Sequence, residues 1–169
     1  MRKTVLFILL TFISISVFAQ IQRKFYDFHL GTTTDKEVVS YFKDKGKEYQ
    51  FEGNTISVSD MKFGGEQWST VIFDFYNNRL YSVSFFNSEL ETSKASLEGI
   101  YNRLKRKLDE KYSSYYDKIS SVNYFIGYTD EKTDACLRFA KIDGVYVLLI
   151  MYSDIELMQS EKDDGKDEL

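Results

Sequence analysis

Two segments of the chain carry apolar residues at helical spacing. The first begins at Thr34-Asp35-Lys36-Glu37, a Thr-x-x-Glu capping box, and Val38, Val39 and Phe42 supply its apolar side. The second extends from about Ser93 to Tyr112, where apolar residues recur every three or four positions. Because each predicted helix is apolar on one side only, we expect each to pack against an apolar surface rather than to be surrounded by one.

Elsewhere in the chain apolar residues alternate with polar ones, which predicts strands. Trp68–Tyr76 and Leu80–Phe86 flank Asn77-Asn78, two residues that tolerate the positive φ of a hairpin turn. After the second helix the pattern returns as strands over 122–128 and around 135–139, an Asp143-Gly144 turn and a strand over 145–152. This last segment is apolar at both odd and even positions, so both of its faces are expected to be buried. We therefore place it centrally in a sheet or beneath a helix.

The order of elements predicts an α+β fold: two amphipathic helices packed on antiparallel β-meanders. The chain has no proline and no Gly/Ser-rich run, so residues 20–158 are expected to form a single domain. Each half, 20–90 and 91–158, pairs one helix with one meander. A tandem helix-plus-sheet repeat and a chance alignment of elements both fit this order.

The first 19 residues have the pattern of an export signal. Arg2 and Lys3 precede an apolar stretch, and Val17-Phe18-Ala19 offers small residues at the −3 and −1 positions of a cleavage site before Gln20. The stretch is short against the ~20 residues that span a bilayer, so we expect cleavage and no transmembrane anchor in the mature chain. The predicted location is periplasmic or extracellular.

The other end, residues 159–169, is rich in acidic residues and lysine and is predicted to be a disordered acidic tail. Its last four residues spell Lys-Asp-Glu-Leu, which is an endoplasmic-reticulum retrieval signal in eukaryotes. The lumen of that compartment is therefore the alternative location, while the pattern of the leader favours bacterial export.

Composition removes several classes of function. With one histidine and one cysteine, the chain lacks the ligands of a His/Cys metal site, and we expect no metal and no cofactor. The formal net charge is −4, and loss of Arg2 and Lys3 with the leader makes it more negative, which argues against nucleic acid as a partner. A single thiol, Cys136, excludes an internal disulfide. The oligomeric state and the ligand are not determined by these features.

A few short motifs are similar to those of small exported proteins of unknown function from Bacteroides-type bacteria. They are the leader ending at Phe18-Ala19-Gln20, Leu30-Gly31-Thr32 before the first helix, Phe63-Gly64-Gly65 before Trp68, and the second helix closing on Lys111-Tyr112. The order of elements also resembles the tandem α+β repeats of β-lactamase inhibitory protein and of small outer-membrane assembly lipoproteins. This resemblance implies an exported binding protein rather than an enzyme, although the chain lacks the cysteine that a lipoprotein leader requires.

No catalytic constellation is predicted from the sequence. Gly64-Gly65 lacks the spacing of a phosphate-binding loop and leads into a strand, so a turn is the better interpretation. His29 has no placed partner, and Cys136 is expected to act as a small apolar residue. A hydrolase would need two carboxylates close together, and nothing in the sequence brings Glu52, Asp60 or Asp74 together.

The aromatic content, 13 Tyr, 14 Phe and one Trp, is the strongest functional hint. Tyrosine and tryptophan are enriched where proteins bind one another. Several tyrosines are expected at element ends or beside charges, namely Tyr41, Tyr49, Tyr76, Tyr115, Tyr116, Tyr124 and Tyr128. The sequence therefore predicts a non-enzymatic binding module whose aromatic sheet face receives a protein, peptide or glycan, with Trp68, Gly64, Gly65 and Tyr76 as contact residues. The alternatives are a hydrolase with surface carboxylates and a structural protein of the cell envelope.

Overall fold

A computed structural model describes residues 20–117 and 124–166 of the chain. The leader predicted at residues 1–19 and the last three residues lie outside this range. The helices are α2 (Asp35–Asp44), α3 (Lys94–Tyr112), the short 3-10 helix η1 (Ser113–Tyr115) and α4 (Ile155–Lys166). The strands are β1 (Lys24–Phe25), β2 (Phe28–His29), β3 (Gln50–Glu52), β4 (Thr55–Phe63), β5 (Glu66–Tyr76), β6 (Arg79–Ser88), β7 (Tyr116–Asp117), β8 (Phe125–Thr129), β9 (Thr133–Ile142) and β10 (Val145–Asp154).

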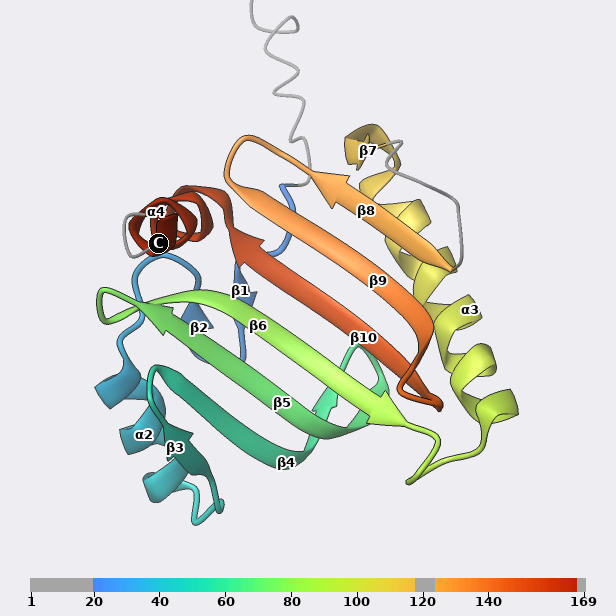
Figure 1. Ribbon diagram of the computed structural model, residues 1–169, viewed down its shortest axis with the longest axis horizontal. Helices are drawn as coiled ribbons and strands as arrows, with labels where there is room; N and C mark the ends of the chain where they lie inside the picture. Colours follow the sequence, from blue (N-terminus) through green and yellow to red (C-terminus); the bar gives the residue numbers. More distant parts are fainter. Residues whose placement is uncertain (1–19, 118–123, 167–169) are drawn as a thin grey trace, which may run out of the picture.

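The fold is α+β, with one large antiparallel sheet in the order β3-β4-β5-β6-β10-β9-β8-β7. A separate two-stranded hairpin, β1–β2, lies behind it together with α2 and α3 (Figure 1). Strand β10 is central, as its apolar residues at both odd and even positions predicted. It pairs with β6 on one side and with β9 on the other. The α+β class and the antiparallel sheet are confirmed.

Local sequence explains where the predicted elements begin and turn. The Thr34–Glu37 capping box is formed in both directions, and Ser93 caps α3 by accepting a hydrogen bond from the backbone of Ser96. Asn77 and Asn78, between β5 and β6, have φ values of 48° and 60°. This left-handed conformation is the one that a two-residue hairpin turn requires, and asparagine tolerates it better than most residues.

The core lies between the sheet and the layer behind it, and much of it is aromatic. The ring of Phe85 on β6 stacks on Phe63 with centroids 4.1 Å apart, and Phe73 on β5 meets Phe28 and Phe42 edge-on or tilted at 5.4 and 5.7 Å. The buried face of α3, which includes Leu97 and Leu104, covers β9 and β10. Aromatic side chains bury the largest areas per residue, so these contacts are a main source of the apolar stabilisation.

A third α-helix, α4, was not predicted from the sequence. It begins directly after β10, where Asp154 Oδ1 accepts a 3.0 Å hydrogen bond from the backbone N–H of Leu157, and Leu157 is buried. This cap and the apolar anchor continue the chain as a helix through residues 159–166, the first part of the segment expected to be disordered. None of the helices described combines the length and apolar character needed to span a bilayer.

Candidate functional site

The face of the large sheet that points away from α2 and α3 is covered only at one end, by α4, among the elements that the structure describes (Figure 1). We call this surface the open face. Strand alternation assigns its members, since residues two apart on a strand share a face. Between its uncovered edge and α4 it carries Ser57, Ser59, Thr70, Ile72, Ser84, Phe86, Phe125, Gly127, Cys136, Arg138, Leu149 and Met151.

One cross-strand row of the open face combines apolar groups with a cation. Phe86 pairs with Leu149, Leu149 with Arg138, and Arg138 with Phe125. The aliphatic and aromatic members are half-buried, whereas Arg138 is exposed. Its guanidinium makes no hydrogen bond or ion pair with any residue in the described part of the chain. The row is therefore an apolar strip with an unpaired positive charge.

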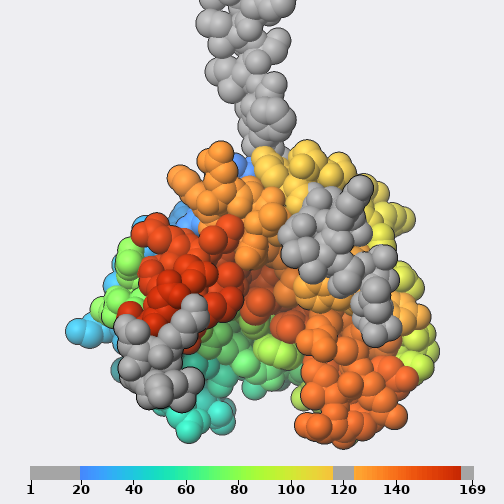
Figure 2. All heavy atoms as spheres, turned by 45° about the horizontal axis from the view of Figure 1, so that its top comes forward, coloured from blue at the N-terminus to red at the C-terminus, as the bar shows by residue number. Residues whose placement is uncertain are grey.

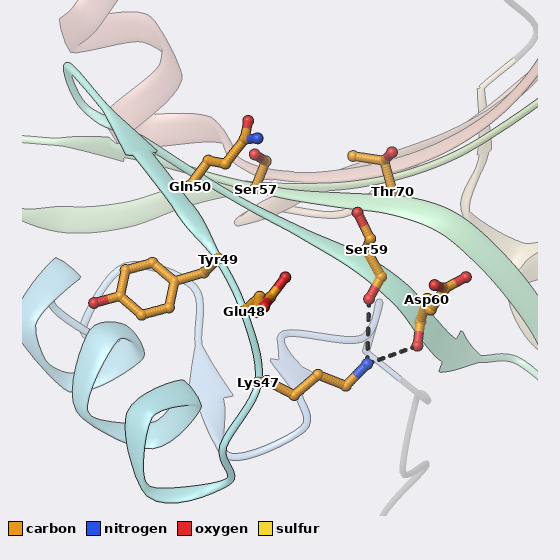
Figure 3. A pocket seen from close by; sticks show the side chains of 8 residues that line it. All are labelled: Lys47, Glu48, Tyr49, Gln50, Ser57, Ser59, Asp60 and Thr70. Atoms are coloured by element: carbon orange, nitrogen blue, oxygen red, sulfur yellow. Dashed lines mark hydrogen bonds between the residues drawn. The ribbon is translucent and has the colours of Figure 1, made fainter.

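Two hollows lie beside this strip. The first, about 240 Å³, is lined by residues of β8, β9, β10 and α4, including Cys136, Met151 and Met158. The second, about 660 Å³, lies where the chain from Lys47 to Gln50 diverges from β4 and β5, and Ser57, Ser59 and Thr70 line its floor (Figure 3). Figure 2 shows the surface hollowed between α4 and the tip of the β9–β10 hairpin, with β5 and β6 below.

The end of the open face beneath α4 is polar and acidic. Asp74 accepts a 2.9 Å hydrogen bond from the Thr55 hydroxyl and pairs across the strands with Ser82. Burial raises the pKa of the Asp74 carboxyl, and Glu161 on α4 raises it further, while the hydroxyls of Thr55 and Ser82 oppose this. Asp74 is thus a partly buried carboxyl next to a second carboxyl, and no cation among the described side chains lowers its pKa.

Cys136 lies in the middle of the open face, opposite Met151. Burial raises the pKa of its thiol to about 11, so the thiolate is scarce at neutral pH. A nucleophilic role would need a lowered pKa, so the raised pKa and the half-buried position of Cys136 agree with its interpretation as a small apolar residue.

Trp68 is not a surface residue, and its predicted role as a contact residue is wrong. The side chain is 0% exposed on the covered face of the sheet, and its ring lies 5.7 Å from that of Phe85. The indole N–H donates a 3.0 Å hydrogen bond to the carbonyl of Phe63. A buried tryptophan with a satisfied N–H is a core residue. The same holds for Tyr128, which was expected near the surface and is buried.

Gly64 and Gly65 form the turn between β4 and β5, and both have positive φ, 64° and 85°. The turn is attached to α3: Lys107 Nζ donates a 2.7 Å hydrogen bond to the carbonyl of Gly64, and Arg103 pairs with Glu66 through two 2.9 Å bonds. These glycines therefore allow a tight turn to dock on the helix, and they lie away from the open face.

The remaining predicted residues are separated in the structure. Tyr76 is half-buried, and its hydroxyl hydrogen-bonds to Asp164 of α4, so it holds the helix. Tyr124 is 55% exposed, but its ring packs on Tyr101 and Phe139 beside α3. Tyr41, Tyr49 and Tyr115 pack in part against the core, and the side chain of Tyr116 lies outside the described residues. These tyrosines therefore do not gather on one face of the sheet.

The three carboxylates that the sequence offered for a hydrolase, those of Glu52, Asp60 and Asp74, do not converge. Asp60 lies five residues beyond Thr55, the strand partner of Asp74, which is about 16 Å along β4. Glu52 is exposed at the outer strand, and His29 is exposed on the β1–β2 hairpin. No group of three or more His, Cys, Asp or Glu residues that could hold a metal ion occurs in the described part of the chain.

The sequence did not single out Arg138 as a contact residue. The alternation of Ala135, Leu137 and Phe139 already put Cys136 and Arg138 together on the other side of their strand. What the pattern lacked was the identity of the neighbouring strands, which the pairing of β9 with β8 and β10 supplies. Comparison of the chain with protein-family models, with curated proteins and with solved structures found no match.

Proposed function

We propose that the protein is a non-enzymatic binding module that receives a polypeptide segment across its open face. The segment would present apolar side chains to the strip formed by Phe86, Leu149 and Phe125, and a carboxylate to Arg138. The single observation that carries this proposal is the exposed guanidinium of Arg138, which lies within an apolar row and has no partner among the described residues. Charge complementarity therefore identifies the chemistry of the partner.

Arginine and aromatic residues are over-represented among the side chains that dominate binding energy at protein interfaces. An apolar surface that surrounds the guanidinium excludes water once a partner covers it, which strengthens the ion pair. The serine and threonine hydroxyls on β4 and β5 add hydrogen-bonding groups at low entropic cost. The described part of the open face offers no exposed tryptophan or tyrosine platform, so a polypeptide is favoured over a glycan.

The arrangement of elements also supports a tandem repeat, as the resemblance to β-lactamase inhibitory protein implies. Helix α2 precedes the meander β4–β5–β6, and α3 precedes β8–β9–β10. The last strands of the two meanders, β6 and β10, pair antiparallel at the centre of the sheet. We infer two equivalent halves joined about this pair.

From the leader we also infer that the protein is exported to the periplasm or outside the cell. The alternative location is the endoplasmic-reticulum lumen, if a retrieval receptor binds the C-terminal Lys-Asp-Glu-Leu.

The proposal is tested by selecting short linear peptides from a displayed library on the protein without its leader. We expect enriched peptides to combine apolar residues with Asp or Glu, and Arg138→Glu to weaken their binding at least about 10-fold, which is ~1.4 kcal/mol. Arg106→Glu is the matched control, because Arg106 is an exposed arginine on α3, behind the sheet.

The control should bind as the wild type does. If the selected peptides bind Arg138→Glu and the wild type equally, the open face is not their site. If binding depends on Arg138 but is found only for glycans, the partner is a glycan and not a polypeptide. A hydrolase would instead cleave the peptides and lose this activity on substitution of a carboxylate.

A further inference from the structure

The hollow of about 240 Å³ on the open face exists because neighbouring strands carry small residues there. Gly127 on β8 pairs with Cys136 on β9, and both line the hollow. Phe125 and, from α4, Met158 supply apolar walls. A Cβ atom added at Gly127 would meet the Phe125 ring at 3.6 Å, an ordinary contact, and no other non-adjacent described residue within 4 Å. The backbone of Gly127 therefore faces open space.

The backbone of β8 does not require a glycine at position 127. The φ of Gly127 is not positive, and β8 pairs with β9 in an unbroken register from Phe125 to Thr129. A glycine inside a strand weakens it, and where no bulge or bend explains the residue, it marks a place where a ligand approaches the backbone closely. The volume of the hollow is below the ~300–1,000 Å³ of clefts that enclose whole small molecules. A single large apolar side chain is therefore the occupant of fitting size.

Two opposite charges flank the hollow along β9. Asp134, Cys136 and Arg138 alternate on the strand, so all three lie on the open face, and each step of two residues covers ~7 Å. Neither charged side chain forms a hydrogen bond or an ion pair with a described residue. Burial is the main cause of the raised pKa of Cys136, and Asp134 raises it further whereas Arg138 lowers it. Both charges therefore act on the space above Cys136, with opposite sign.

We propose that the hollow receives one apolar side chain of a bound polypeptide that is extended along β9, with an acidic side chain two residues away at Arg138 and a basic side chain two residues away, in the other direction, at Asp134. The inference rests on the proposed function and specifies the partner of the same site. Charge complementarity at both ends and the apolar lining between them identify this chemistry.

An extended segment fits the three positions better than a helix does. It has the same rise per residue as β9, so its alternate side chains match all three positions at once. A helix covers comparable distances in about four and about eight residues, and these residues turn progressively away from the facing side. A segment with the reverse order of charges would put its acid beside Asp134 and its base beside Arg138. The two charges therefore also fix the direction of the segment.

The test uses the displayed peptide library of the proposed function and compares the positions of the enriched residues. We expect the pattern acid–x–apolar–x–base, in either chain direction, to be enriched at least about 10-fold over its frequency in the unselected library. The same three residues at consecutive positions cannot share one side of an extended segment, so that pattern should show no enrichment.

Gly127→Leu fills the hollow with a side chain of the protein itself. It should weaken the binding of the enriched peptides at least about 10-fold. Its thermal stability should equal or exceed that of the wild type, because a glycine inside a strand is replaced where there is room for a side chain. Gly99→Leu is the matched control, because Gly99 lies on α3, behind the sheet, and this variant should bind as the wild type does.

Asp134→Lys reverses one charge and leaves the hollow unfilled. We expect peptides selected on this variant to carry an acid where the wild type selects a base, with the apolar position unchanged. This variant decides the matter if circular dichroism shows that Gly127→Leu is misfolded.

The outcomes separate this inference from the proposed function. If binding depends on Arg138 but Gly127→Leu binds as tightly as the wild type, the open face binds peptides and the hollow takes no side chain, which overturns this inference alone. Peptides that keep the base when they are selected on Asp134→Lys would overturn the charge assignment. If no selected peptide depends on Arg138, the proposed function itself is wrong.

Discussion

On the covered face of the sheet, the rings of Trp68, Phe73 and Phe85 pack against a second layer. The open face presents hydroxyls, aliphatic groups and the charge of Arg138, which no described residue pairs. Both faces belong to the same strands and alternate residue by residue. The difference teaches that the high aromatic content serves stability on one side, while the side with fewer rings is the one left accessible. Substitutions on the two faces should therefore have different consequences.

The largest effect on stability is expected from Trp68→Ala. Removing a buried tryptophan leaves a cavity and costs about 3–5 kcal/mol of the free energy of unfolding, measured by urea denaturation. Tyr76→Phe is the matched control, because both residues were predicted from sequence as contacts and only Trp68 is in the core. The control should lose about 0.5 kcal/mol or less, since the hydroxyl that bonds to Asp164 is at the surface. Equal losses would show that the two faces are not distinct.

The thiol of Cys136 reports on the open face through its reactivity. A pKa raised to about 11 makes the thiolate about 100-fold scarcer near neutral pH than in a thiol with a pKa of 9.0. We expect slow reaction with a disulfide reagent, with a rate that increases across the alkaline range, and fast reaction in urea. Rapid labelling of the folded protein at pH 7 would mean that the pKa is not raised.

Asp74→Asn should raise stability at neutral pH by about 0.5 kcal/mol. The pKa of this carboxyl is raised in the folded state, so the unfolded chain loses the proton first and stability falls as pH increases through the folded pKa. Asparagine can still accept the hydrogen bond of Thr55 and has no such dependence. The two proteins should be closest in stability in acid and diverge toward pH 7, and parallel pH profiles would contradict this account.

The smallest effect on stability is expected from Arg138→Ala. The side chain is exposed and unpaired among the described residues, so its removal should change the free energy of unfolding by no more than about 0.5 kcal/mol. A loss of several kcal/mol would mean that Arg138 supports the fold, and any loss of binding would then have another explanation. Thermal unfolding of the variant beside Arg106→Ala makes the comparison.

Local patterns predicted much of the fold and little of the site. The capping box at Thr34, the asparagine turn and the alternation in β9 are set by neighbouring residues, and the structure has all three. The burial of Trp68 depends on Phe85 of the neighbouring strand, which is distant in sequence. The same is true of α4, whose start depends on the cap of Asp154 and on Leu157 reaching the sheet.

The most direct test of the account is a hydrogen-exchange footprint of a selected acidic–apolar peptide on the protein. Because side chains of the open face come from β4, β5, β6, β10, β9 and β8, we expect slowed exchange in these strands at their uncovered ends, and no slowed exchange in α2. The Arg138→Glu variant should show no footprint at the same peptide concentration. Protection centred on α2 or α3, or an unchanged footprint in that variant, would contradict the assignment of the open face as the binding surface.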